Sequence, residues 1–106
     1  MFKVDKAGHE TVVYNFAGPD GNFPVEGLTR DGNGTLYGTT LYGGGYVGNV
    51  FKLDTSTGAE SVVYDFTGGT DGAYPGGFFK DATGNLYGAT GSGGAYGFGN
   101  IFKITP

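Results

Sequence analysis

Tyrosine, phenylalanine and aspartate side chains recur inside the glycine-rich stretches of this 106-residue chain, and they are the residues best suited to ligand binding. An aromatic ring can stack on the face of a sugar or another flat group, and an aspartate carboxylate can accept hydrogen bonds from hydroxyl groups. The candidate ligand-binding residues are Tyr42, Tyr46, Tyr96, Phe98, Asp20 and Asp71.

The same residues also have a purely structural interpretation. Glycine pairs let the backbone adopt positive φ and approach a neighbouring segment closely. Asp-Gly steps form turns, and a tyrosine in such a loop can pack over the edge of the next sheet. The sequence leaves both interpretations open.

The residue pattern gives little support to metal or cofactor chemistry. The chain has no cysteine, which excludes thiolate nucleophiles, disulfides and cysteine-ligated metals. The segment DGNG at residues 31–34 begins like a calcium loop, but Tyr42 occupies the twelfth position, where such a loop needs glutamate. The segment GGGYVG at residues 43–48 lacks the GK[ST] ending of a phosphate-binding loop.

The titratable residues do not form a catalytic set either. His9 is the single histidine, and it sits in a turn without a counterpart in the second half of the chain. Asp65, Asp71 and Asp81 belong to different elements, so nothing pairs them as the two carboxylates of a glycosidase. We therefore expect no enzymatic activity, no catalytic residues, no metal and no cofactor.

The charge balance excludes two classes of partner. The net charge is −4 and only six residues are Lys or Arg, so the electrostatic attraction needed for nucleic acid or for an anionic membrane surface is missing. No apolar run approaches the ~18–20 residues of a membrane span, and residues 1–10 are typical of a strand entering a turn. We expect no membrane insertion.

An internal repeat is the main feature of the sequence. Several blocks recur 50 or 51 positions apart, and the small slips fall in loops, which tolerate insertions. The segment MFKVD at residues 1–5 is a third copy of the last block. The matched blocks are residues 11–16 (TVVYNF) with 61–66 (SVVYDF), 34–40 (GTLYGTT) with 84–90 (GNLYGAT), and 49–54 (NVFKLD) with 100–105 (NIFKIT).

Each copy contains four runs of alternating apolar and polar residues, bounded by Gly, Asp, Asn and Pro. Phe51 and Leu53, for example, share one face of a strand while Lys52 faces the other way. No segment has the period of a helix. Four short strands in every 40 to 50 residues are typical of a β-propeller blade.

The sequence therefore predicts an all-β fold of two four-stranded antiparallel β-propeller blades. Repeat 1 covers residues 1–49, with the third and outer strands followed by the inner and second strands. Repeat 2 covers residues 50–99, and residues 100–106 form an extra copy of the third strand.

Two blades do not close a propeller, which needs ~4–8. We expect copies of the chain to complete a ring by self-assembly, and the redundant third strand permits strand exchange between chains. Two alternatives remain: the two repeats pack as an isolated sandwich, or the chain is an excised or engineered fragment of a longer array.

The longer loops are expected at one end of the strands, where a binding face would lie. Alternate loops of an antiparallel meander emerge at alternate ends, which brings four long glycine-rich loops together and leaves the short turns at the other end. The long loops are residues 17–24, 41–49, 67–75 and 91–100, and the short turns are residues 31–34, 54–58 and 81–84.

The blocks at residues 61–75 (SVVYDFTGGTDGAYP) and 84–105 resemble the GloVer-type tandem repeat of bacterial choice-of-anchor proteins. The resemblance covers nearly the whole chain in both copies, but it carries no defined activity. It implies an exported protein at the bacterial cell surface or outside the cell. The chain departs from the usual form in having two copies and in lacking a signal and an anchor.

From these observations we expect a non-catalytic repeat module for structure or recognition, whose main partner is a copy of itself. A carbohydrate-binding, lectin-like propeller is the alternative, with glycans as partners. An enzyme, such as a glycoside hydrolase or lyase with its site at the ring axis, is a further alternative.

Overall fold

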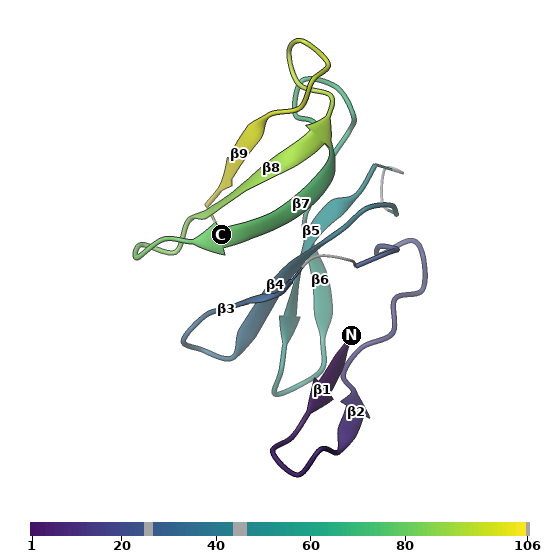
Figure 1. Ribbon diagram of the computed structural model, residues 1–106, viewed down its shortest axis with the longest axis vertical. Helices are drawn as coiled ribbons and strands as arrows, with labels where there is room; N and C mark the ends of the chain where they lie inside the picture. Colours follow the sequence, from purple (N-terminus) through teal and green to yellow (C-terminus); the bar gives the residue numbers. More distant parts are fainter. Residues whose placement is uncertain (25–26, 44–46, 106) are drawn as a thin grey trace.

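The computed structural model describes residues 1–24, 27–43 and 47–105. These residues form nine β-strands and no helix (Figure 1). The strands are β1 (Phe2–Val4), β2 (Glu10–Val12), β3 (Thr29–Arg30), β4 (Thr35–Thr40), β5 (Asn49–Asp54), β6 (Glu60–Asp65), β7 (Ala73–Lys80), β8 (Leu86–Ser92) and β9 (Ile101–Ile104).

The strands pair in chain order into three antiparallel sheets. β1 and β2 form a hairpin, β3–β4–β5–β6 form a four-stranded meander, and β7–β8–β9 form a three-stranded meander. The all-β class and the tandem organisation are confirmed. Where the sequence predicts two four-stranded sheets, only one has four strands among the described residues. The reason is that β2, the other strand of the outer type, pairs with β1 and not with β9.

The four-stranded sheet is offset from the sequence repeats. It runs from β3 to β6 and therefore crosses the predicted boundary between residues 49 and 50. Each of the two larger sheets thus takes its first two strands from one repeat and its remaining strands from the next copy.

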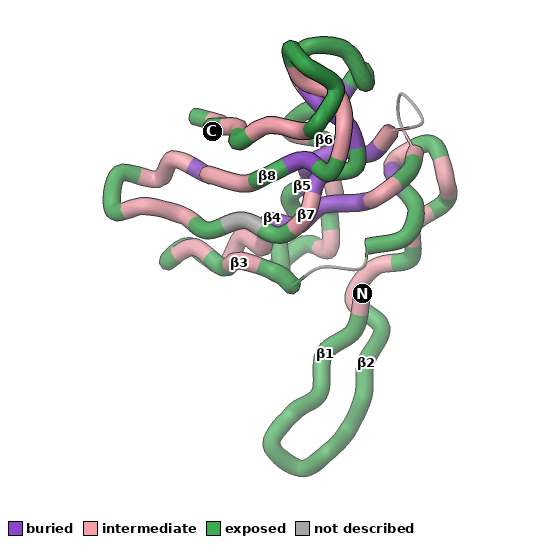
Figure 2. The backbone as a smooth tube through the Cα atoms, turned by 45° about the horizontal axis from the view of Figure 1, so that its top comes forward, coloured by how far each residue is buried: buried purple, intermediate pink, exposed green. Residues whose placement is uncertain are grey.

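The core lies between the two larger sheets. Tyr37 and Val50 from the four-stranded sheet pack with Leu86 from the three-stranded sheet and with Phe66, which follows β6. Burying an aliphatic or aromatic side chain of this size contributes on the order of 1.5–3 kcal/mol. Figure 2 shows the buried segments gathered on β4, β5 and the start of β7, while the β1–β2 hairpin is exposed throughout.

The first half of strand β5 is buried on both faces, at Val50 and Phe51. Phe51 and Leu53 are fully buried and Lys52 between them is exposed, as the alternation predicts. In β6 the alternation of residues shows which side chains share a face of the strand, but it does not show which face packs against the core. Val63 packs against the core, whereas Val62 and Tyr64 remain 38% and 40% exposed.

The same aromatic chain joins each outer strand to the following sheet. Tyr14 meets Phe16 edge-to-face at 5.1 Å between ring centroids, and Phe16 meets Phe51 at 4.9 Å. In the second copy Tyr64 meets Phe66 at 5.1 Å, and Phe66 meets Phe102 at 5.1 Å. Edge-to-face pairs add about 0.5–1.5 kcal/mol to the area they bury, so each copy is fastened to the next by the same packing.

Two glycines allow the long loops to return close to the sheet. Gly48 and Gly99 have φ of +97° and +95°, and a Cβ at either position would lie 2.3 or 2.4 Å from the carbonyl oxygen of Thr40 or Thr90. A backbone oxygen cannot rotate away as a side chain can. Only glycine fits these two positions.

We predict that Gly99→Ala destabilises the protein far more than Gly84→Ala. Both glycines have nearly the same φ, +95° and +94°, but a Cβ at Gly84 would meet no atom within 4 Å. Alanine at Gly84 should therefore lose only the ~1–2 kcal/mol of left-handed strain, and alanine at Gly99 should lose about 1–3 kcal/mol more from overlap. Urea unfolding followed by circular dichroism measures both, and equal losses would contradict the close approach.

Candidate functional site

Asp20 and Asp71, the two acidic candidates, lie at equivalent positions in the turns that follow the outer strands. Asp71 accepts hydrogen bonds from the Tyr64 hydroxyl at 2.8 Å and from the Thr67 amide at 3.0 Å. Asp20 accepts them from the Tyr14 hydroxyl and from the Ala17 amide. In this structure both carboxylates hold their own turns together, and their contact with a ligand stays a prediction.

The surroundings keep these two carboxylates ionised. Hydrogen bonds from the Thr67 side chain, and then from Tyr64, lower the pKa of Asp71. Burial would raise the pKa of Asp20, but the hydrogen bonds from Tyr14 and Ala17 outweigh it and lower that pKa.

The pKa of Glu60 is shifted in the opposite direction, above its ordinary value. Burial raises the pKa of Glu60, and its Oε1 atom is buried without a hydrogen-bond partner among the described residues. Its Oε2 lies 3.1 Å from the Tyr14 hydroxyl. The single phenolic proton of Tyr14 therefore stands between two carboxylates, Asp20 and Glu60, whose pKa values move apart.

A threonine and an asparagine, hydrogen-bonded to each other, close the loops at residues 41–49 and 91–100; we call this pair the threonine–asparagine clasp. Thr40 Oγ1 donates to Asn49 Oδ1 at 2.9 Å and accepts from the Asn49 amide, while Asn49 Nδ2 donates to the carbonyl of Asp20. Thr90 and Asn100 make the same bonds in the second copy, with the carbonyl of Thr70 as acceptor. The long loops of each copy therefore share one end of the sheets, which confirms the loop arrangement predicted from the sequence.

Three exposed aromatic rings form a row across the two copies, which we call the aromatic row: Phe23, Tyr42 and Tyr74. Their centroids are 5.5 and 5.7 Å apart, with edge-to-face angles of 74° and 77°. The rings are 55%, 42% and 39% exposed. Tyr42 was predicted as a ligand-binding residue, and the other two were missed. The signal was present in the paired segments GNFP and GAYP, where both residues precede a proline.

The backbone under the aromatic row is strained at both ends. Phe23 and Tyr74 have φ of +54° and +56°, and they are the described non-glycine residues with positive φ. Such a conformation is an outlier for a bulky residue and costs of the order of 1–3 kcal/mol. Because strain of this kind gathers at ligand-binding positions, its occurrence in both copies favours a role for the row in binding.

The remaining sequence candidates lie elsewhere. Tyr96 and Phe98 are 88% and 91% exposed in the loop between β8 and β9. Among the described residues no ring contact joins either of them to the aromatic row. Tyr46 lies outside the described residues.

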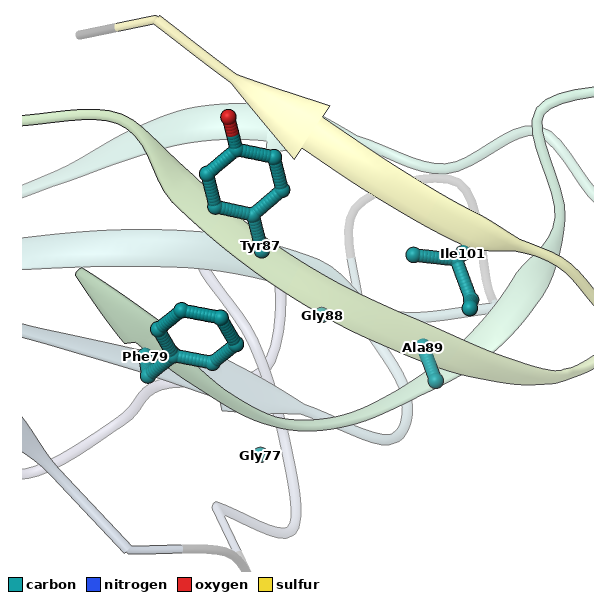
Figure 3. A pocket seen from close by; sticks show the side chains of 6 residues that line it. All are labelled: Gly77, Phe79, Tyr87, Gly88, Ala89 and Ile101. Atoms are coloured by element: carbon teal, nitrogen blue, oxygen red, sulfur yellow. The ribbon is translucent and has the colours of Figure 1, made fainter. Parts of the chain in front are cut away.

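A shallow apolar hollow of about 490 Å³ lies on one face of the three-stranded sheet (Figure 3). Phe79 and Tyr87 stack along it at 5.7 Å, and Ala89 and Ile101 extend it. Phe79 and Ile101 are 64% and 83% exposed. Among the described residues that line the hollow, Tyr87 carries the one titratable group, so the hollow is suited to apolar packing. Sequence reasoning assigned these residues to strands, and the prediction of two blades implied unmatched sheet faces, but it did not single out the residues of this hollow.

Neither a metal-binding cluster nor a long apolar helix occurs among the described residues. No three His, Cys, Asp or Glu side chains come close enough to hold a metal ion. No helix in the same part of the chain has the length and hydropathy required to cross a membrane.

Together these features define an all-β tandem-repeat protein, in which two copies of one unit repeat the same hydrogen bonds, aromatic contacts and glycine approaches. The family model described as the Gloeobacter/Verrucomicrobia repeat matches residues 1–106. The chain belongs to this family, which confirms the expectation of a bacterial repeat protein. No curated protein and no solved structure matches the chain.

We predict that the stability of the protein falls on acidification and that Asp71 causes part of the loss. A carboxyl group with a lowered folded-state pKa stabilises the fold above its ordinary value of 3.8, and this contribution disappears as the pH falls through the folded value. Thermal midpoints measured from neutral pH downward should therefore decline below pH 3.8, and less steeply in Asp71→Asn.

The control for this experiment is Asp65→Asn, which removes an exposed carboxylate from β6. This variant should follow the wild-type profile. If Asp71→Asn also follows it, the hydrogen bonds from Thr67 and Tyr64 do not couple Asp71 to folding.

Proposed function

We propose that this chain is a non-catalytic β-propeller repeat module that serves structure or recognition and assembles with copies of itself into a closed ring. One observation carries the proposal: the polar residues shared by the two copies enter the same internal hydrogen bonds. Asp20 and Asp71 close turns, and Thr40 and Thr90 clasp loops. Their chemistry supports the fold.

The arrangement of the sheets supports the propeller. A four-stranded antiparallel meander packs face-on against the next meander, through Val50 and Leu86. The Thr39 hydroxyl also donates to the Gly76 carbonyl across this junction at 2.9 Å. Successive propeller blades are related in this way, so the two larger sheets would be neighbouring blades.

We place the parent protein outside the bacterial cytoplasm, at the cell surface or secreted. Membership of a bacterial repeat family and the resemblance to choice-of-anchor proteins support this location. An acidic chain without cysteine is compatible with an extracellular setting.

The aromatic row favours carbohydrate binding as a second candidate function. Three exposed rings stand at the loop end of the sheets, and two of them sit on strained backbone. Exposed aromatic faces suit the apolar faces of sugar rings, which makes a glycan the proposed ligand of the row.

We predict that Tyr74→Ala and Tyr42→Ala each weaken the binding of any glycan captured on an array by roughly tenfold, since each removes one ring from the row. Tyr96→Ala is the matched control, because it removes an exposed tyrosine outside the row. If Tyr96→Ala abolishes binding and Tyr74→Ala does not, the loop between β8 and β9 is the binding site.

The non-catalytic assignment has its own test. Incubation with a broad panel of polysaccharides should release no new reducing ends. Turnover that disappears in Asp71→Asn would contradict the non-catalytic assignment and identify the protein as an enzyme.

A further inference from the structure

We propose that the outer edge of β9 binds strand β2 of a second copy of this chain, and that β2 leaves β1 to do so. This inference rests on the proposed self-assembly and names the strand, the register and the competing segment. It follows from three positions at which the first copy makes a contact that the second copy lacks: a strand edge, a tyrosine–carboxylate pair and a sheet face.

The first place is the edge of β9. In the four-stranded sheet β6 pairs along the outer edge of β5, with Phe51 opposite Val62 and Lys52 opposite Ser61. Strand β9 is the copy of β5, but no strand pairs with its outer edge among the described residues. A hollow of about 250 Å³ borders this edge instead, lined by Tyr64, Asp71 and Ile104. An unpaired edge with free backbone groups is a template for another strand.

The occupant is identified by its sequence and register. Residues 10–16 (ETVVYNF) copy residues 60–66 (ESVVYDF), the segment that contains β6. Strand β2 already pairs with β1 in the register of the complete sheet, with Phe2 opposite Val12 and Lys3 opposite Thr11. The FK pair of β1 recurs in β9 as Phe102 and Lys103, so β9 can replace β1 residue for residue.

The second place is the tyrosine–aspartate pair. In the first copy Tyr14 contacts both Asp20 and Glu60, and Glu60 is the first residue of the neighbouring outer strand. In the second copy Tyr64 contacts Asp71, and no glutamate among the described residues accompanies them. Glu10 is the counterpart of Glu60 and begins β2. Placed on β9 in the register of the complete sheet, β2 would bring the Glu10 of the second copy to Tyr64.

The third place is the apolar face of the three-stranded sheet. Tyr37, Thr39 and Val50 are buried under that sheet, at 8%, 2% and 0% exposure. Their counterparts are Tyr87, Ala89 and Ile101, which line the uncovered hollow of Figure 3. In the first copy this face is covered by the three-stranded sheet, through β7 and through Leu86 of β8. The corresponding face of a second copy, with Leu36 and Phe51, would cover the hollow as β2 docks.

Moving β2 from β1 to β9 loses few stabilising contacts. β1 and β2 are exposed at every residue, with Phe2 67% and Val12 53% exposed, and an isolated hairpin is marginally stable in water. The backbone hydrogen bonds that β2 gives up on β1 are remade on β9, while the apolar hollow becomes buried. β1 is therefore an internal competitor that occupies β2 until a second copy arrives, as in domain swapping.

The experiment uses paired cysteines, because the chain has none of its own. The register places Lys103 opposite Thr11 of the second copy, as Lys52 lies opposite Ser61. Thr11→Cys with Lys103→Cys in one chain should therefore give a ladder of disulfide-linked chains on a non-reducing denaturing gel. Opposed residues in neighbouring strands lie within the Cα separation that a disulfide needs.

Two controls accompany the exchange pair. Lys3→Cys with Thr11→Cys joins β1 to β2 within one chain, so oxidation should hold the protein as a monomer and reduction should restore assembly. Thr11→Cys with Ala95→Cys puts the second thiol in the loop between β8 and β9, and it should give no ladder.

Sedimentation of the wild-type chain separates the failure of the exchange from the failure of the ring. A dimer, trimer or tetramer together with the ladder supports both proposals. An oligomer without the ladder, whose assembly is unaffected by the β1–β2 disulfide, overturns the exchange and leaves the ring. A wild-type monomer at every concentration overturns self-assembly and the exchange with it, while leaving the glycan-binding test unaffected.

Discussion

A β-sheet that is apolar on both faces must be covered on both faces, and this constraint determines the rest of the structure. Val50 and Phe51 are neighbours in β5, so they face opposite sides, yet both are fully buried. One side is covered by the three-stranded sheet and the other is reached by Phe16 from the segment after β2. The repeat is therefore a unit of packing that is completed by its neighbours, in the manner of stacked repeat proteins.

The polar residues of the repeat make this stacking regular. Each long loop is tied to its sheet by the threonine–asparagine clasp and to the preceding turn through the asparagine side chain, as in Asn49 and Asn100. Buried polar groups satisfied in this way specify one arrangement and exclude slippage of the strands. A loop end held so firmly can support strained backbone at Phe23 and Tyr74, and with it the aromatic row.

The sequence was sufficient for the strand order, because alternating runs separated by turn residues mark the strands of a meander, and for the sharing of one end by the long loops, because alternate loops of a meander emerge at alternate ends. It was insufficient wherever the outcome depends on a partner surface. Alternation in β6 could not tell that Val63 packs against the core while Val62 stays exposed, since Val63 shares its face with the polar residues Ser61 and Asp65. Nor could it show that Phe23 and Tyr74 meet Tyr42, because that contact joins distant segments through an uncommon φ.

The offset between sheets and repeats has a consequence for how such a protein can change in length. Because each of the two larger sheets draws strands from two successive copies, a tandem duplication or loss of one 50-residue copy leaves the junctions between these sheets with the same pairing partners. The new copy meets its neighbours through contacts that already exist, including the Phe16–Phe51 and Phe66–Phe102 ring pairs. Arrays of different length can thus arise by recombination without any new interface having to evolve.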